Sequence, residues 1–323
     1  MLRRSSIAVV LGALAALPCA ARSAHSQDYP TRPVTLVLPF PAGSGIDVTA
    51  RLVADNLSSR LGQPVVVENK PGANGVVAAT AVARAAPDGY TIFMTTNSSH
   101  SAAPFLLKSI PYDPVKDFAP VSRIGNLPFI MVIGKSVPAN DFREFVAYAK
   151  ANPAKLNYAS SNVTGIVGGA MVQRLAGVQL NHIPYKSAPQ AIQDLLRGEI
   201  SMMFVDFATG LPHVKSGAVR ALAVTTADRS TLVPDVPSMK EIGLDFDMAS
   251  WNAIFAPAGT PRPIVDRLNK ELRAIIADPV VRERLRNVGF DAFSSTPDEL
   301  GEFVRGELVK WSRWTKEAGI KAE

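Results

Sequence analysis

Two short loops hold the residue types in this chain that are best suited to binding an anion. The first spans Val37 to Gly45 and the second spans Asn157 to Gly165, and each lies between a strand-like run and a helical pattern. Small residues at such a junction let backbone N–H groups approach a ligand, and the first turn of a helix has free donors and a partial positive charge. Each junction could therefore hold a carboxylate without a basic side chain.

One loop of this kind is too weak to explain useful affinity. A helix terminus contributes about 0.3 to 1 kcal/mol when exposed and about 2 kcal/mol when partly buried, whereas micromolar binding requires about 8 kcal/mol. Two opposed loops that close and exclude water supply several charge-assisted hydrogen bonds together. The pattern thus favours a hinged cleft. The alternative is that both loops are ordinary turns, in which Gly and Ser are common.

Two acidic residues lie close to these positions. Asp47 falls just inside the first helical pattern, where a carboxylate either stabilises the helix start or accepts a hydrogen bond from a ligand. Asp206 follows the strand-like run from Ile200 to Val205, at the strand end where open α/β sheets bind ligands. A plain turn role for Asp206 is the alternative.

Other kinds of chemistry have little support. His100, His182 and His213 are too far apart for a metal motif, and no HExxH or cysteine cluster accompanies them. The run Gly43-Ser44-Gly45 is not a G-x-S-x-G elbow, and Gly72 to Gly75 lacks the P-loop lysine and the G-x-G-x-x-G pattern. The motifs of the sequence contain no nucleophile paired with a general base. We therefore expect no enzymatic activity, no metal and no cofactor.

The first 26 residues are typical of an export signal. The pair Arg3-Arg4 gives a positive start, an apolar run extends from Ile7 to Leu17, and small residues follow up to Ser26. We predict a signal peptide over 1–26 and a location in the periplasm; cleavage after Ala21 or Ser23, and export by the twin-arginine route, are alternatives.

Composition supports an ordinary globular protein after export. The only cysteine, Cys19, lies in the leader, so the mature chain forms no disulfide. Removing the leader removes three arginines and no acid, which lowers the formal net charge from +6 to +3. Because the remaining basic residues are interleaved with acids, nucleic-acid binding is not indicated.

Strand-like runs alternate with helical patterns along most of the chain, which predicts α/β layers with mainly parallel sheets. The length of 323 residues favours two domains. The predicted strands are Val34 to Leu38, Val65 to Glu68, Tyr90 to Thr95, Ile130 to Ile133, Leu156 to Ala159, His182 to Pro184, Ile200 to Val205 and Val219 to Thr225.

The C-terminal part differs, because it contains helices only. Helical patterns run from Thr260 to about Ala277, from Pro279 to near Gly289, and from Thr296 to Gly319. We expect these helices to pack back on the first domain, with Trp311 and Trp314 as core or docking residues rather than ligand platforms.

Many ordered motifs of the mature chain are similar to those of one family. They include Pro39-Phe40-Pro41 through Asp47, Leu61 to Ala73, Ala86 to Thr91, Leu156 to Ser161, Pro184-Tyr185-Lys186, Arg220 to Thr225 and Ala256 to Pro261. The chain resembles the periplasmic solute receptors of tripartite tricarboxylate transporters, also called Bug receptors.

This resemblance implies a type II periplasmic-binding-protein fold, in which two α/β lobes are joined by two crossing strands and close on a ligand. The crossings would fall near Arg123 to Phe129 and Met248 to Phe255. The first lobe would then comprise 27–126 with 251–323, and the second 127–250.

The resemblance also implies which residues grip the ligand. The first loop would contribute Phe40, Gly43, Ser44 and Asp47, the second Ser160, Ser161, Asn162 and Thr164, and the distal part Thr96, Asn97, Tyr185, Asp206 and Trp251. Some positions depart from the family: Ser44 replaces a usual glycine, the second loop is shorter, and Val205 precedes Asp206 where family members often have Asp next to Phe.

By the same resemblance, the chain is expected to be a monomeric, non-enzymatic receptor. It would capture a small organic acid with one or two carboxylates, with aromatic acids and amino acids among the candidates, and deliver it to a transporter with two integral membrane subunits. A sensory adaptor that presents the bound acid to a sensor kinase is the alternative, since the same clamp would serve both roles.

Overall fold

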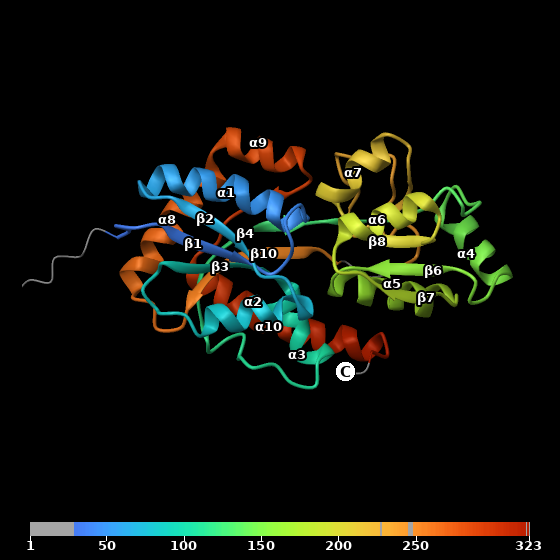
Figure 1. Cartoon of the computed structure of the whole chain (residues 1–323). Helices are drawn as coiled ribbons and strands as arrows, with labels where there is room; N and C mark the ends of the chain where they lie inside the picture. Colours follow the sequence, from blue (N-terminus) through green and yellow to red (C-terminus); the bar gives the residue numbers. More distant parts are fainter. Residues whose placement is uncertain (1–28, 227, 245–247, 321, 323) are drawn as a thin grey trace, which may run out of the picture.

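The computed structural model describes residues 29–226, 228–244, 248–320 and 322, and these form two sheets with helices on their faces (Figure 1). The predicted signal peptide, 1–26, lies outside the described residues. Sheet A has the strand order β11-β4-β10-β3-β1-β2 and sheet B the order β7-β6-β8-β5-β9. We call sheet A with its helices the A half and sheet B with its helices the B half.

The A half is built from both ends of the described chain. Its strands are β1 (Val34–Leu38), β2 (Val65–Asn69), β3 (Thr91–Thr96), β4 (Phe118–Leu127), β10 (Ser250–Pro257) and β11 (Asp291–Ala292). Its helices are α1 (Gly45–Leu61), η1 (Ala73–Gly75), α2 (Val76–Ala83), η2 (Ser98–Ala102), α3 (Ala103–Leu106), α8 (Arg262–Ala277), α9 (Pro279–Asn287) and α10 (Pro297–Glu317).

The B half is built from the middle of the chain. Its strands are β5 (Phe129–Ile133), β6 (Asn157–Ser160), β7 (Asn181–Pro184), β8 (Met202–Asp206) and β9 (Arg220–Val224). Its helices are α4 (Phe142–Ala151), α5 (Val163–Ala176), α6 (Ala188–Arg197) and α7 (Phe207–Lys215). All eight strands that the alternating pattern predicts are present, with ends that differ by one or two residues.

The prediction of mainly parallel sheets is wrong. β1 is parallel to β2 and β3, and β6 is parallel to β7 and β8, but β10 is antiparallel to β3 and β4, and β5 is antiparallel to β8 and β9. The reason is that β4 leaves the A half and β10 returns to it, so these two strands run in opposite directions.

The two crossings between the halves lie side by side. Pro128 alone separates β4 from β5, and Ser250 at the start of β10 pairs with Leu127 at the end of β4. Backbone hydrogen bonds join Thr225 N to Phe129 O (2.9 Å) and Met248 N to Thr225 O (3.0 Å). The halves are therefore connected by a narrow pair of adjacent segments.

Strand alternation gives sheet A two apolar faces. Leu36 and Leu38 pack with α1, α8 and α9, whereas Val37 between them packs with α2 and the start of α10. Figure 1 shows these helix groups on opposite sides of the sheet. Burying one such side chain stabilises the fold by about 1.5 to 3 kcal/mol, so packing on both faces holds the strands of sheet A in place. Within the described residues, no helix is long and apolar enough to cross a bilayer.

The last helix packs mainly on the A half, through β4, η2 and α3, as the sequence predicts for the C-terminal helices. Leu300 and Val304 join an apolar cluster of sheet A, whereas Trp311 and Trp314 join a cluster that contains Ala102 and Leu106 of the A half and core residues of sheet B. The end of α10 also contacts the B half, because the Arg174 side chain of α5 donates to Glu317 O. A helix of 21 residues is about 30 Å long, which suffices to reach from one half to the other.

A buried carboxylate fastens this helix to the returning strand. Oε2 of Glu307 accepts hydrogen bonds from Nε1 of Trp251 (3.1 Å) and Nε1 of Trp311 (3.2 Å), and Oε1 accepts one from Nζ of Lys310 (3.1 Å). Glu307 is only 6% exposed. Because both indole N–H groups are buried, they depend on this acceptor.

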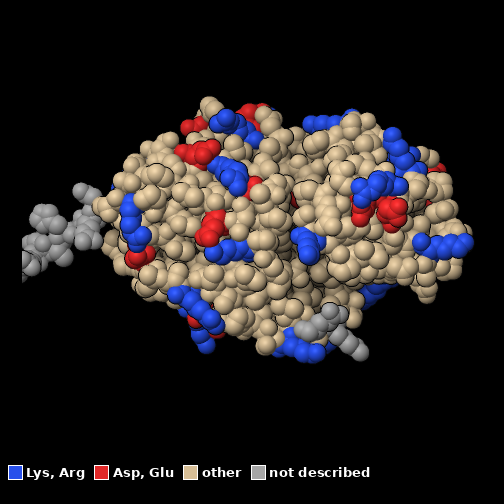
Figure 2. Space-filling view, viewed as in Figure 1, with Lys and Arg blue, Asp and Glu red and all other residues tan. Residues whose placement is uncertain are grey.

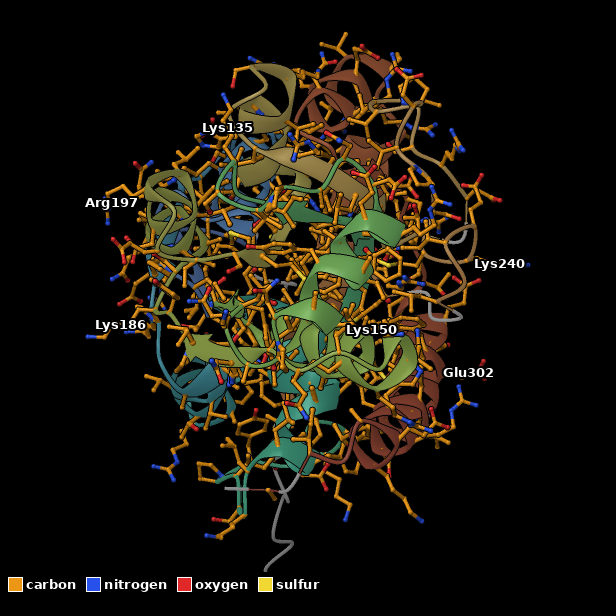
Figure 3. The ribbon with its side chains drawn as sticks, turned by 90° about the vertical axis from the view of Figure 1, so that its right-hand side faces the viewer. Lys135, Lys150, Lys186, Arg197, Lys240 and Glu302 are labelled. Carbon is orange, nitrogen blue, oxygen red and sulfur yellow. The ribbon has the colours of Figure 1, made fainter. Side chains whose placement is uncertain are left out.

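We predict that Glu307→Ala lowers the free energy of unfolding by about 2 kcal/mol or more, since two buried donors lose their partner. Urea unfolding followed by tryptophan fluorescence measures this change. Glu302→Ala is the matched control, because Glu302 lies on the same helix and extends into solvent (Figure 3). Equal stabilities of the two variants would contradict the role of Glu307.

Candidate functional site

A small cavity of about 40 Å³ lies between the two halves. The A half lines it with Phe40, Pro41, Ser44, Gly45, Ile46, Thr96, Ser98, Leu127 and Ser250, and the B half with Phe129, Ser161, Asn162, Ser187, Ala188 and Asp206. At about 10 to 15 Å³ of such volume per water molecule, the cavity holds only a few waters. Its walls come from both halves, so its size depends on how closely they approach.

Helix starts converge on this cavity. The N-terminal residue or the N-cap of α1, α5, α6, α7 and the short π-helix η2 is in each case a lining residue. Asn162 caps α5 through Gly165 N (3.0 Å), and Ser187 caps α6 through Gln190 N (3.4 Å). The free N–H groups of a first helical turn attract negative charge. The helix starts therefore offer donors for an anion without a basic side chain.

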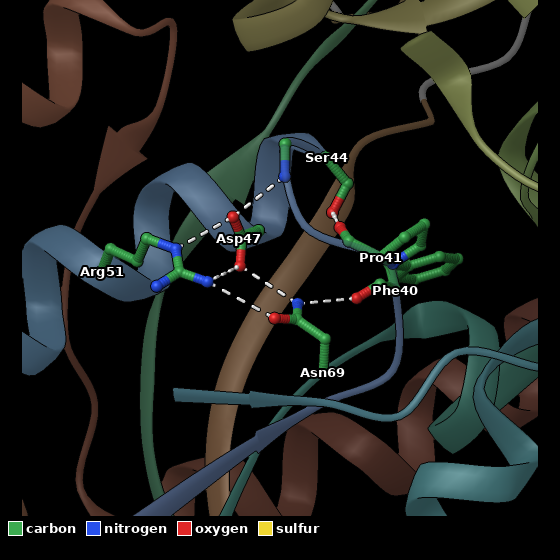
Figure 4. Close-up of polar contacts among 7 residues, drawn as sticks. Phe40, Pro41, Ser44, Asp47, Arg51 and Asn69 are labelled. Carbon is green, nitrogen blue, oxygen red and sulfur yellow. Dashed lines mark hydrogen bonds and ion pairs between the residues drawn. The ribbon is translucent and has the colours of Figure 1, made fainter. Parts of the chain in front are cut away.

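The first loop is held by a carboxylate that does not line the cavity. Asp47 accepts hydrogen bonds from Gly43 N (3.0 Å), from Nε (3.0 Å) and Nη2 (2.9 Å) of Arg51, and from Nδ2 of Asn69 (3.0 Å) (Figure 4). Nδ2 of Asn69 also donates to Phe40 O (2.9 Å). Asp47 thus positions the loop, and its oxygens are already occupied by groups of the A half.

These contacts also determine the ionisation of Asp47. Burial by itself would raise the pKa of this carboxyl, but the hydrogen bonds from Arg51, Gly43 and Asn69 outweigh burial and lower the pKa below its usual value. Asp47 is therefore ionised at neutral pH.

The second loop contributes two residues to the lining and two to its support. Ser161 and Asn162 line the cavity. Oγ of Ser160 instead lies 2.6 Å from Nε2 of His182, and Oγ1 of Thr164 accepts a hydrogen bond from Nδ2 of Asn97 (3.2 Å). The bond from Asn97 to Thr164 joins the A half to the B half and is fully buried.

Two further predicted residues lie at the carboxyl ends of strands and line the cavity. Thr96 ends β3, and its Oγ1 accepts a hydrogen bond from Ser98 N (3.1 Å). Asp206 ends β8 and caps α7, where Oδ1 accepts from Thr209 N (2.9 Å) and Oδ2 from Thr209 Oγ1 (3.2 Å). Burial raises the pKa of Asp206, and the hydrogen bonds from Thr209 oppose this effect only in part.

The remaining predicted residues do not reach the cavity. Nε1 of the buried Trp251 donates to Glu307, and the Tyr185 hydroxyl donates to Oδ2 of Asp194 (2.6 Å). Gly43 lies in the first loop with φ 78°, a left-handed conformation that favours glycine. Phe40, Ser44, Thr96, Ser161, Asn162 and Asp206 are the predicted residues that the fold brings together around the cavity.

Several lining residues were not predicted from the sequence. Ser187 had a usable signal, because Ser187-Ala188-Pro189 reads as a helix cap followed by an early proline. Ser250 lies at the start of the returning strand, and its Oγ donates to Oδ1 of Asn97 (2.9 Å). No local motif marks Ser250 as a lining residue, since only the crossing of the chain places it there.

The lining contains one charged side chain, Asp206, among the residues that the structure describes. Lys186 directly precedes Ser187 but extends into solvent (Figure 3). The described residues also include no group of three or more His, Cys, Asp or Glu side chains that could hold a metal ion. The site can therefore bind an anion through backbone and hydroxyl donors.

Comparison with known proteins agrees with this chemistry. A family model described as "Tripartite tricarboxylate transporter family receptor" matches residues 49–320. The chain belongs to this receptor family. Since its members are solute receptors, the predictions of the family and of a receptor rather than an enzyme are confirmed.

Solved structures of this receptor family have the same fold. The structure titled "R. palustris Rpa4515 with adipate" superimposes with a TM-score of 0.89 at 33% identity, covering 92% of this chain and 100% of that one. The periplasmic binding protein BugD gives 0.87 at 36% identity (91% and 100%), and MatC from Rhodopseudomonas palustris with bound malate gives 0.82 at 33% identity (88% and 99%). The predicted periplasmic-binding-protein fold is confirmed.

We predict that Asp47→Asn lowers the free energy of unfolding at pH 7 by about 1 to 3 kcal/mol, because the charged acceptor of three groups is lost. The folded-state pKa lies below the unfolded value of about 3.9. The contribution is therefore complete above about pH 4 and is lost as the pH falls through the folded-state pKa.

Urea unfolding at a series of pH values tests this. The stability difference between wild type and Asp47→Asn should narrow as the pH decreases below about 4. Asp55→Asn, an exposed position on the same helix, is the control. A difference that stays constant down to low pH would contradict the assignment.

Proposed function

We propose that this receptor works in the periplasm, binds a small organic carboxylate in the cavity between its two halves, and delivers it to a membrane transporter with two integral membrane subunits. The observation that carries the proposal is the convergence of helix starts from both halves on one cavity whose lining includes no Lys, Arg or His among the described residues. Relatives solved with adipate and with malate support an organic acid as ligand.

The halves correspond to the proposed lobes. Residues 27–126 with 251–323 would form the first lobe and 127–250 the second, joined at Pro128 and at the segment before Ser250. The cavity is too small for a molecule of several carbon atoms, so the ligand would enter when the lobes separate and would be enclosed when they close. Tighter binding to the closed form is what drives such closure.

Export and surface properties fit this role. A leader over 1–26 would direct the chain to the periplasm and leave Gln27 as the mature N-terminus. On the face shown in Figure 2, Lys and Arg are scattered and interleaved with Asp and Glu, which does not suggest a nucleic-acid surface. We expect the mature protein to be a monomer.

The ligand class is tested by thermal unfolding. The protein is first refolded to remove bound molecules and then mixed with a panel of monocarboxylates, dicarboxylates, tricarboxylates, aromatic acids and amino acids. A true ligand at one hundred times its Kd should stabilise the fold by about 2.7 kcal/mol. A panel in which every acid leaves the unfolding temperature unchanged would refute the proposal.

Closure is tested at Gly45, the first residue of α1. A methyl group at this position would lie 2.4 Å from Oδ1 of Asp206, which belongs to the other half and is held by Thr209. It would also lie 2.6 Å from Cδ2 of Leu127 in the same half. Gly45→Ala should therefore block full closure and weaken carboxylate binding at least about tenfold, or about 1.4 kcal/mol, while the fold stays intact.

The matched control is Gly306→Ala on α10, where an added methyl group meets no atom within 4 Å. Alanine is the better helix former, so Gly306→Ala should not lose stability. Gly45→Ala loses some stability through its overlap with Leu127, and urea unfolding measures this loss separately from the affinity. Isothermal titration with an acid from the panel measures the affinities. Wild-type affinity in Gly45→Ala would show that the halves do not close at this contact.

A further inference from the structure

Asp206 is a buried acidic side chain in a cavity whose other lining groups favour binding of an anion. It is 4% exposed, and its side chain forms no ion pair among the described residues. Its oxygens accept hydrogen bonds from the backbone N–H and the hydroxyl of Thr209. Each carboxylate oxygen can accept more than one hydrogen bond, so Asp206 retains capacity toward the cavity.

Asp206 also lies close to where a ligand carboxylate would bind. A methyl group at Gly45 would overlap its Oδ1, so the acid of the B half faces the start of α1 in the A half. The starts of α5 and α6 line the same small cavity through Asn162 and Ser187. A ligand carboxylate held by these helix starts would therefore lie next to the carboxylate of Asp206.

Two carboxylates enclosed together repel each other unless a proton or a cation lies between them. The lining supplies no cation from its described residues, and its hydroxyl groups are neutral. A proton on Asp206, whose pKa burial raises, would remove the repulsion, whereas a cation carried by the ligand would remove it and add an ion pair with Asp206. Because Asp206 faces the carboxylate position, that cation would be attached to the carbon next to the ligand carboxylate.

We propose that Asp206 makes this receptor selective for α-amino carboxylates, with the ligand ammonium paired to Asp206 and the ligand carboxylate at the starts of α1, α5 and α6. The inference rests on the proposed function and names the ligand class of the same site. An α-hydroxy acid would offer a hydrogen bond without the charge, and a dicarboxylate without either group would leave the two anions unpaired.

The test uses pairs of acids that differ only in the ammonium group: succinate with aspartate, and adipate with 2-aminoadipate. Wild-type protein should bind at least one amino member at least tenfold tighter than its unsubstituted partner by isothermal titration. Asp206→Asn should reduce or reverse this ratio. Asparagine caps a helix as well as aspartate does, so α7 should stay intact.

Asp141→Asn is the matched control, because Asp141 caps α4 through Glu144 N (2.7 Å) in the same half and lies outside the cavity. It should keep the wild-type ratio. Equal or tighter wild-type binding of the unsubstituted acids, tighter binding of malate than of aspartate, or an unchanged ratio in Asp206→Asn would overturn the selectivity. Failure of all these acids and of the wider panel to bind would instead refute the proposed function.

Discussion

The proposed site depends on one constraint: a carboxylate taken out of water needs donors, and the donors that face the cavity are backbone groups at helix starts. In each half, strands end at the cavity and helices begin there, so Gly45, Asn162 and Ser187 meet although they are far apart in sequence. A single helix start is weak. Only the pairing of two halves places enough of them around one enclosed volume.

Support for this arrangement lies behind the lining. Asp47 and Asn69 fix the backbone of the first loop, and the hydrogen bond from Asn97 to Thr164 joins the halves directly. On another side of the molecule, α10 packs on the A half, is fastened to β10 by Glu307, and meets α5 of the B half at its end through Arg174. The relative position of the halves is therefore set by buried polar contacts as well as by the crossing strands.

Residues that the sequence marks for ligand contact divide into two groups in the structure. Ser44, Ser161 and Asp206 line the cavity, because they stand at the junction of a strand and a helix, where the side chain or its neighbours face the opposite half. Asp47 lies three residues after Ser44, and its carboxylate accepts hydrogen bonds from Gly43 and Arg51 of the same half instead of facing the cavity. The sequence pattern alone could not distinguish these outcomes, since an acid in a first helical turn satisfies either role.

The sequence by itself determined the positions of most strands and helices, the two loops at helix starts and the family, because hydrophobic periodicity, capping residues and motifs are local properties. The tertiary structure decided which loops face each other, the antiparallel direction of β10, the cluster that Trp311 and Trp314 join, and the place of Ser250 in the lining. These features depend on contacts between segments more than a hundred residues apart, and no local pattern specifies which distant segment a residue will meet.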